Sequence, residues 1–163
     1  MAGSENKYDV IVIGGGHAGC EAALAAARMG TRTALLSLYL DNTAMMPCNP
    51  SIGGPAKGHL VREGSAVGGE QAEAADKSAV LIRRLNTSKG PAVQALRAQC
   101  DLREYAAWFT MAVETQKNLD VRQELVTDLW IEQGMARGVK TRYGPIYEAG
   151  SVVLASGTYL GGR

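Results

Sequence analysis

The stretch that decides the fold is Tyr8-Asp-Val-Ile-Val-Ile-Gly-Gly-Gly-His-Ala-Gly19. Its first half is a run of β-branched apolar residues, as in a strand of a parallel sheet that is buried on both faces. The alanine-rich residues 18–29 predict a helix that ends at Gly30, and residues 33–37 predict a second strand. Strand, glycine turn, helix and strand in this order form a βαβ unit.

The turn from Gly14 to Gly19 matches the G-x-G-x-x-G pattern of dinucleotide-binding loops, and it lies between a strand and a helix as that pattern requires. Gly14 allows the tight turn, Gly16 lets the backbone approach a pyrophosphate, and Gly19 lets the helix pack closely on the strand. The free N–H groups at the helix start would face the phosphates. The predicted phosphate loop also contains Gly15, His17 and Ala18.

An acidic residue that binds the ribose often follows the second strand of such a unit. Here that strand ends in Leu36-Ser37-Leu38, and Asp41 lies a few residues on, in the expected loop. We therefore do not assign a ribose contact to Asp41. The glycine pattern by itself does not distinguish NAD from FAD.

The middle of the chain is less regular. Residues 38–58 form a loop too long for a plain connection and too apolar for disorder, which favours a functional loop. We expect a short helix over 58–63, a helix over 76–85 with Asp76 as its cap, and a long helix over 92–117 that follows Pro91. Short strands are expected at residues 121–124, 128–133, 137–142, 146–148 and 151–154.

This layout resembles the FAD domain of the glutathione-reductase-like flavoproteins, in which a meander follows the fingerprint half and a last strand closes over the flavin. Residues 152–158, Val-Val-Leu-Ala-Ser-Gly-Thr, match that closing strand. We predict an α/β fold: a Rossmann-like FAD-binding domain over residues 1–163, with a parallel sheet and a β-meander, and incomplete.

Composition sets further limits. A net charge of +1 gives no global field that attracts nucleic acid, but residues 83–103 hold five basic residues and one acid, either a basic patch or a solvated helix face. The three cysteines lack metal-ligand spacing, so no metal site is expected. No apolar run reaches the length of a membrane span, and residues 1–7 carry no secretion signal, which favours a cytoplasmic protein.

Two further blocks identify a family. They are residues 42–63, Asn-Thr-Ala-Met-Met-Pro-Cys-Asn-Pro-Ser-Ile-Gly-Gly-Pro-Ala-Lys-Gly-His-Leu-Val-Arg-Glu, and residues 85–99, Leu-Asn-Thr-Ser-Lys-Gly-Pro-Ala-Val-Gln-Ala-Leu-Arg-Ala-Gln. With the fingerprint and the closing strand, they resemble the MnmG (GidA) family over essentially the whole chain. The resemblance implies an FAD enzyme that uses NADH as reductant and methylene-folate as carbon donor. It also implies modification of carbon 5 of the tRNA wobble uridine (position 34) by a homodimer that works with the GTPase MnmE.

The resemblance also implies site residues. It places the loop that contains Asn49, Ser51, Gly53 and Gly54 near the isoalloxazine, and a backbone contact to the adenine end at Val126. The closing turn contributes Gly157 and Thr158. Cys48 is a weak candidate for a reactive thiol, since a small buried residue is the more ordinary interpretation. Candidate ligands for flavin or RNA phosphates are Lys57, Lys89 and Arg97.

The chain also departs from the family. Members are several times longer, so we expect the NADH-binding insert and the carboxy-terminal helical domain to be absent, and the 163-residue chain not to be catalytically competent alone. Gly64 stands where the family has a different residue and weakens a helix there by about 1 kcal/mol relative to Ala. Two alternatives remain open: a freestanding dinucleotide-binding module, or a relative of the folate- and FAD-dependent tRNA methyltransferase TrmFO.

Overall fold

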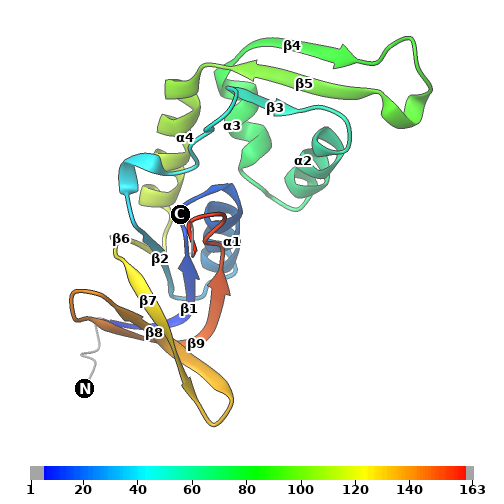
Figure 1. Ribbon diagram of the computed structural model, residues 1–163. Coiled ribbons are helices and arrows are strands. Elements are labelled where there is room, and N and C mark those ends of the chain that lie inside the picture. Colours follow the sequence, from blue (N-terminus) through cyan, green and yellow to red (C-terminus); the bar gives the residue numbers. More distant parts are fainter. Residues whose placement is uncertain (1–5, 161–163) are drawn as a thin grey trace. The chain divides into compact units, whose positions relative to one another are not determined.

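A computed structural model describes residues 6–160 (Figure 1). Two compact units make up the chain. The glycine-loop unit consists of the chain up to Ala44 together with the chain from Ala112 onward. The hairpin unit consists of Met45–Met111. Each unit has its own β-sheet.

A six-stranded sheet forms the centre of the glycine-loop unit, in the order β6-β2-β1-β9-β8-β7. Strands β6, β2, β1 and β9 are parallel, whereas β8 and β7 are antiparallel and form the meander. Helix α1 packs on the parallel strands. The elements are β1 (Lys7–Ile13), α1 (His17–Arg28), β2 (Thr33–Ser37), η2 (Leu40–Asn42), β6 (Leu119–Gln123), β7 (Val126–Glu132), β8 (Met135–Thr141) and β9 (Ile146–Leu154).

Burial explains why these segments become strands and a helix. All five residues of β2 are buried, as the continuous apolar run predicts for a strand covered on both faces. The buried side of α1 consists mainly of small residues, among them Gly19, Cys20 and Ala23, so the helix lies close to the sheet. One core cluster joins side chains of β1, β2, β8 and β9 and thereby ties the meander to the parallel strands.

The closing strand differs from the prediction in one respect. The sequence predicts two strands, at 146–148 and 151–154, but β9 runs unbroken from Ile146 to Leu154. Gly150 lies within the strand, where an added Cβ would be 3.3 Å from the carbonyl oxygen of Asp9 in β1. The glycine therefore marks a close approach of two backbones rather than a turn.

The hairpin unit contains a three-stranded antiparallel sheet in the order β3-β5-β4 (Figure 1). Helix α2 packs on β3 and β5, and α3 packs on β5. Within residues 6–160, no helix is both long enough and apolar enough to cross a bilayer. The elements are β3 (Ser51–Gly53), α2 (Lys57–Ala66), α3 (Gln71–Ser78), β4 (Ala79–Leu85), η3 (Pro91–Val93), β5 (Ala95–Cys100) and the start of α4 (Leu102–Thr115).

Two helix predictions were wrong in this unit. The expected helix over 76–85 is the end of α3 followed by strand β4, and the expected helix over 92–117 is a helix only from Leu102. Strands β4 and β5 pair with each other from Ala79–Cys100 to Leu85–Ala95. Asp76 lies inside α3, whereas the residue that caps a helix is Asp101: its Oδ1 accepts hydrogen bonds from the backbone N–H groups of Arg103 (2.8 Å) and Glu104 (3.0 Å).

We expect Asp101→Ala to lower the free energy of unfolding by about 1 kcal/mol, because two N–H groups at the start of α4 lose their acceptor. Asp101→Asn keeps a side-chain oxygen at this position and should retain most of the stability. Urea unfolding followed by circular dichroism measures both variants. Equal losses for Ala and Asn would contradict the capping role.

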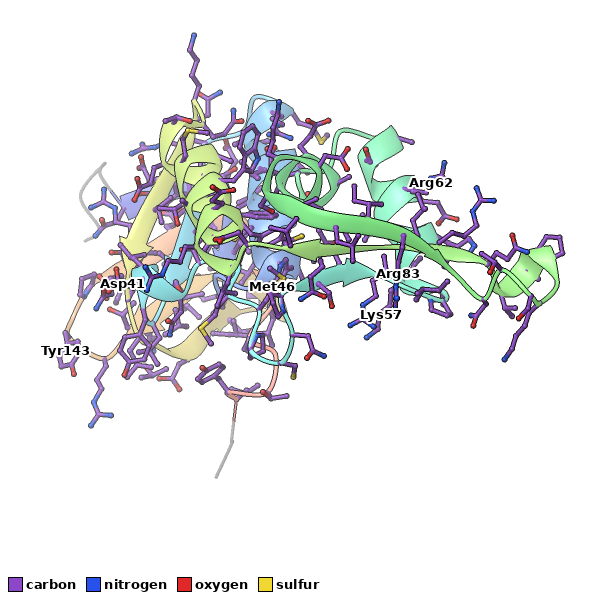
Figure 2. The ribbon with its side chains drawn as sticks, turned by 90° about the horizontal axis from the view of Figure 1, so that it is seen from above. Asp41, Met46, Lys57, Arg62, Arg83 and Tyr143 are labelled. Atoms are coloured by element: carbon purple, nitrogen blue, oxygen red, sulfur yellow. The ribbon has the colours of Figure 1, made fainter. Side chains whose placement is uncertain are left out.

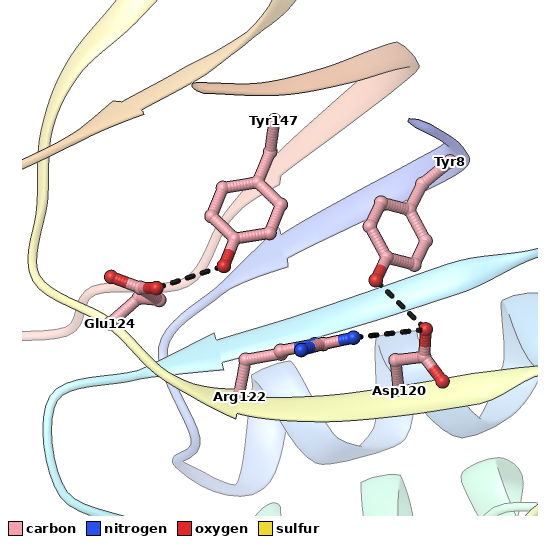
Figure 3. Close-up of polar contacts among 5 residues, drawn as sticks. All are labelled: Tyr8, Asp120, Arg122, Glu124 and Tyr147. Atoms are coloured by element: carbon pink, nitrogen blue, oxygen red, sulfur yellow. Dashed lines mark hydrogen bonds and ion pairs between the residues drawn. The ribbon is translucent and has the colours of Figure 1, made fainter. Parts of the chain in front are cut away.

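Two buried tyrosines bind carboxylates beneath the meander (Figure 3). The hydroxyl of Tyr8 in β1 donates to Asp120 of β6 over 2.8 Å, and that of Tyr147 in β9 donates to Glu124 over 2.8 Å. The guanidinium of Arg122 lies 3.9 Å from the Asp120 carboxylate. Burial, followed by the adjoining carboxylates, raises the pKa of Tyr8 and raises the pKa of Tyr147 to about 12.

This cluster makes stability depend on alkaline pH. The folded protein binds the phenol proton of Tyr147 more tightly than the unfolded chain does. Its contribution is therefore complete below the ordinary tyrosine pKa of about 10 and is lost as pH rises towards 12. We expect the free energy of unfolding to fall from about pH 10 to about pH 12, and less steeply in Tyr147→Phe. The control is Tyr143→Phe, since Tyr143 is 82% exposed; equal slopes in both variants would contradict this account.

Candidate functional site

The order of the parallel strands places two loops next to each other. Strand β1 has β2 on one side and β9 on the other, so the chain leaves β1 at the point where the strand order reverses. Ligands of open α/β sheets bind at such switch points, beyond the carboxyl ends of the strands. The two loops that meet here are the glycine loop, Gly14–Gly19, and the turn after β9, residues 155–158. The N–H of Ala155 donates to the carbonyl of Ile13 over 2.8 Å.

The glycines of the loop have separate steric roles. A Cβ at Gly14 would lie 2.4 Å from the carbonyl oxygen of Ala155, and a Cβ at Gly19 would lie 1.7 Å from that of Gly14. Both positions are therefore filled by the protein itself. A Cβ at Gly16 would meet nothing within 4 Å. Of these three glycines, only Gly16 leaves open space, next to the first residues of α1.

The start of α1 has the electrostatic character of an anion site. Its cap residue, Gly16, makes no side-chain hydrogen bond, and the first turn holds no acidic residue. The N–H groups there carry the positive end of the helix dipole. Burial lowers the pKa of His17, with Glu21 opposing the shift, so the imidazole is mainly neutral at pH 7.

Hydrogen bonds to neighbouring segments hold the glycine loop in place. The N–H of Gly14 donates to the carbonyl of Leu36, and the N–H of Ala44 donates to that of Gly15, each over 2.8 Å. The thiol of Cys20 also donates to the Gly15 carbonyl, over 3.3 Å. Burial raises the pKa of Cys20 to about 12, so this thiol is a packing group and not a nucleophile.

Three further predicted cofactor-binding residues lie in the glycine-loop unit. Val126 is the first residue of β7 and packs against the core cluster. Gly157 has φ +57 in the turn that follows β9, and Thr158 beside it is exposed. Asp41 lies in the short η2 turn beyond the end of β2 (Figure 2).

The remaining candidates belong to the hairpin unit, where β3 and β5 bring three of them together. The guanidinium of Arg97 donates to the hydroxyl of Ser51 over 2.9 Å, and Gly53 is the strand partner of Arg97. A Cβ at Gly53 would lie 2.4 Å from the Leu96 carbonyl oxygen, so sheet packing requires this glycine. An added Cβ at Gly54, which has φ +98, would meet nothing within 4 Å.

The other four are dispersed over this unit. Asn49 and Cys48 precede β3, Lys57 begins α2, and Lys89 lies in the loop between β4 and β5, away from the Ser51–Arg97 pair. Cys48 is exposed, whereas Cys20 and Cys100 are buried. The exposure of Cys48 leaves it available as a thiol. No group of three or more possible metal ligands occurs within the described residues.

One set of residues was missed by the sequence prediction. Between α2 and the β4–β5 hairpin lies a hollow of about 300 Å³. Its polar lining consists of His59, Arg62, Arg84 and Gln94. The sequence contained no signal for this convergence, because residues 76–85 had the spacing of a helix and Arg84 was placed on it.

The fold and the glycine loop together define the class of protein. This is a mixed α/β fold of the FAD-dependent oxidoreductase type, with a parallel sheet and an antiparallel meander, in the form of a partial domain. The myxobacterial halogenase CndH, a variant of FAD-dependent halogenases, shares this fold with a TM-score of 0.66 and 24% identity over 94% of this chain and 38% of its own. The predicted fold class is confirmed.

The chain belongs to the family described as glucose inhibited division protein A, whose profile matches residues 9–163. The tRNA uridine 5-carboxymethylaminomethyl modification enzyme MnmG of Heliobacterium modesticaldum is 57% identical over 157 residues, which are 96% of this chain and 25% of that protein. GidA of Aquifex aeolicus superposes with a TM-score of 0.94 and 47% identity over 98% of this chain and 26% of its own. The family prediction is confirmed, and the chain spans about a quarter of the length of these relatives.

The steric roles of the glycines lead to a stability prediction. Gly19→Ala places a methyl group on the Gly14 carbonyl oxygen and should lower the free energy of unfolding by about 1–3 kcal/mol or more. Gly16→Ala enters open space and should cost less than about 1 kcal/mol, through weaker helix capping. Thermal and urea unfolding of the two variants give the comparison. A larger loss for Gly16→Ala would contradict the assignment of Gly19 to packing.

Proposed function

We propose that this chain binds FAD through the glycine loop, as the flavin-binding part of an enzyme that modifies carbon 5 of the tRNA wobble uridine. The observation that carries the proposal is the open space at Gly16 between two glycines whose positions are filled. A backbone without side chains, at an uncapped helix start with no acid in its first turn, suits a pyrophosphate.

The chain's other residues complete the proposed flavin site. Gly14, Gly15 and Gly19 shape the loop, while His17 and Ala18 contribute amides at the start of α1. Val126 at the start of β7, and Gly157 and Thr158 in the turn after β9, would contact the nucleotide. The loop containing Asn49, Ser51, Gly53 and Gly54 would lie near the isoalloxazine, with Cys48 as a weak candidate thiol.

Both units would then belong to one FAD-binding domain over residues 1–163. When bound, FAD would supply the redox chemistry. The chain's own part is to bind and orient the flavin and to keep acidic groups away from its phosphates.

Family membership supports the proposals for the whole protein. A relative of 57% identity is named for tRNA uridine 5-carboxymethylaminomethyl modification. We infer NADH as the reductant, methylene-folate as the carbon donor, and tRNA and the GTPase MnmE as partners of a cytoplasmic homodimer. The chain spans a quarter of that relative, so we expect the 163 residues to bind flavin without catalysing turnover by themselves.

A flavin titration tests the proposal. FAD is added to the purified protein while flavin fluorescence and the visible spectrum are followed, with NAD as competitor. We expect saturable binding that NAD does not displace. Gly16→Val should abolish it, because the side chain fills the space next to the α1 amides.

A matched control separates ligand loss from unfolding. Gly64 of α2 also meets nothing within 4 Å of an added Cβ, so Gly64→Ala should bind FAD as well as the unchanged protein and gain up to about 1 kcal/mol of stability. Folding of Gly16→Val is checked by its melting curve. Full FAD binding by folded Gly16→Val would refute the assignment of the loop, and displacement by NAD would refute the choice of flavin.

A further inference from the structure

The β4–β5 hairpin of the hairpin unit carries basic residues but no acidic ones. Residues 79–100, which form both strands and the loop between them, include four basic residues and no acidic residue. The net charge of the whole chain is only +1, so this charge is concentrated locally. The four residues are Arg83, Arg84, Lys89 and Arg97.

The hollow beside the hairpin adds basic groups from a second element. Arg62 and His59 of α2 line it together with Arg84 of β4, and no acidic residue is part of its lining. The amide of Gln94 also lines it and supplies a further N–H donor. Figure 2 shows Arg62 on α2 and Arg83 on the hairpin. Guanidinium groups bind phosphate in a bidentate manner, which makes such a hollow suited to a phosphate group.

Two arginines lie directly opposite each other across the paired strands, which is an unfavourable arrangement of like charges. Arg83 of β4 is the direct cross-strand partner of Arg97 in β5. Side chains at such positions lie on the same face with their Cβ atoms about 5 Å apart, and like charges there destabilise a sheet. The Ser51 hydroxyl accepts a hydrogen bond from Arg97 but brings no negative charge.

None of the described carboxylates pairs with these groups. Arg62, Arg83, Arg84 and Arg97 form no ion pair with any acid of residues 6–160. Arg83 and Arg84 are neighbours along a strand, so they point to opposite faces of the hairpin. A single small anion cannot contact the basic groups on both faces. A chain of phosphates can contact the groups on one face and then those on the other.

We propose that the hairpin and its hollow bind the phosphodiester backbone of RNA, with Arg62 and Arg84 on one face and Arg83 and Arg97 on the other. This inference rests on the proposed function for the identity of the RNA as the substrate to be modified. The contacts are to phosphates, so they fix the position of the RNA without reading its sequence. Binding must therefore depend strongly on salt.

The test measures the fluorescence anisotropy of a fluorescein-labelled anticodon stem-loop RNA with the full 163-residue chain, at KCl concentrations from about 50 to about 200 mM. We expect Arg62→Gln/Arg84→Gln to weaken binding about tenfold or more at about 100 mM KCl and to reduce the slope of log K against log salt by about 1.4, for two lost phosphate contacts. Arg83→Gln should lower the slope further when added to this pair.

The matched control is Arg137→Gln/Arg142→Gln, which removes the same charge from exposed positions of the glycine-loop unit and should bind RNA nearly as the unchanged protein does. Equal losses in the two double variants, or no RNA binding by the unchanged protein at the lowest salt, would overturn the inference. FAD is titrated into every variant. Loss of FAD binding in Arg62→Gln/Arg84→Gln would assign the hollow to the flavin and also overturn it. If FAD binds none of the proteins but the RNA pattern holds, the flavin proposal fails and this inference stands.

Discussion

The glycine-loop unit depends on one close approach: the carbonyl oxygen of Gly14 lies where a side chain at position 19 would begin. This approach brings the first turn of α1 directly onto the end of β1. The carbonyl of Ala155 closes over the other side of the same turn, 2.4 Å from where a Cβ of Gly14 would be. The glycine turn and the end of β9, which are distant in the sequence, therefore meet at a point that tolerates no side chain. Gly16 is next to that point and is not part of the contact, which is why its open space suggests a ligand rather than a packing defect.

The hairpin unit follows a different constraint. Among the strands of residues 6–160, β4 pairs only with β5, and most of its residues are exposed, including Val80, Leu81 and Ile82. Its polar groups are all basic, and one pair of arginines is opposed across the strands. Strand β4 therefore gains little from burial, and the like charges opposed across the strands lower stability. The arrangement makes physical sense where another molecule supplies the negative charge.

The parts of the fold that could be predicted from sequence are those with a strong local signal. Strand β1, helix α1 and strand β2 follow from an apolar run, a glycine turn and an alanine-rich stretch. The meander was also predicted, apart from the continuity of β9 through Gly150. Strand β4 was not, because neither of its faces is buried and its sequence therefore lacks the alternation that indicates a strand. The start of α4 did have a signal, since Asp101 is followed three residues later by Glu104. The predicted helix nevertheless began at residue 92, before this signal.

The candidate site divides in the same way. Gly14, Gly16 and Gly19 were assigned separate roles from the pattern alone. Gly14 and Gly19 make the close backbone contacts that their roles require, whereas Gly16 faces open space and its contact to a pyrophosphate stays a prediction. The same measure separates Gly53, which strand packing requires, from Gly54, which faces open space, although the sequence places them side by side. The hollow at Arg62 and Arg84 had no such signal, because it arises from a helix and a hairpin that only the tertiary structure brings together. Local pattern thus identifies a loop that acts through its own backbone, whereas a site built from side chains of separate elements becomes visible only once the chain is folded.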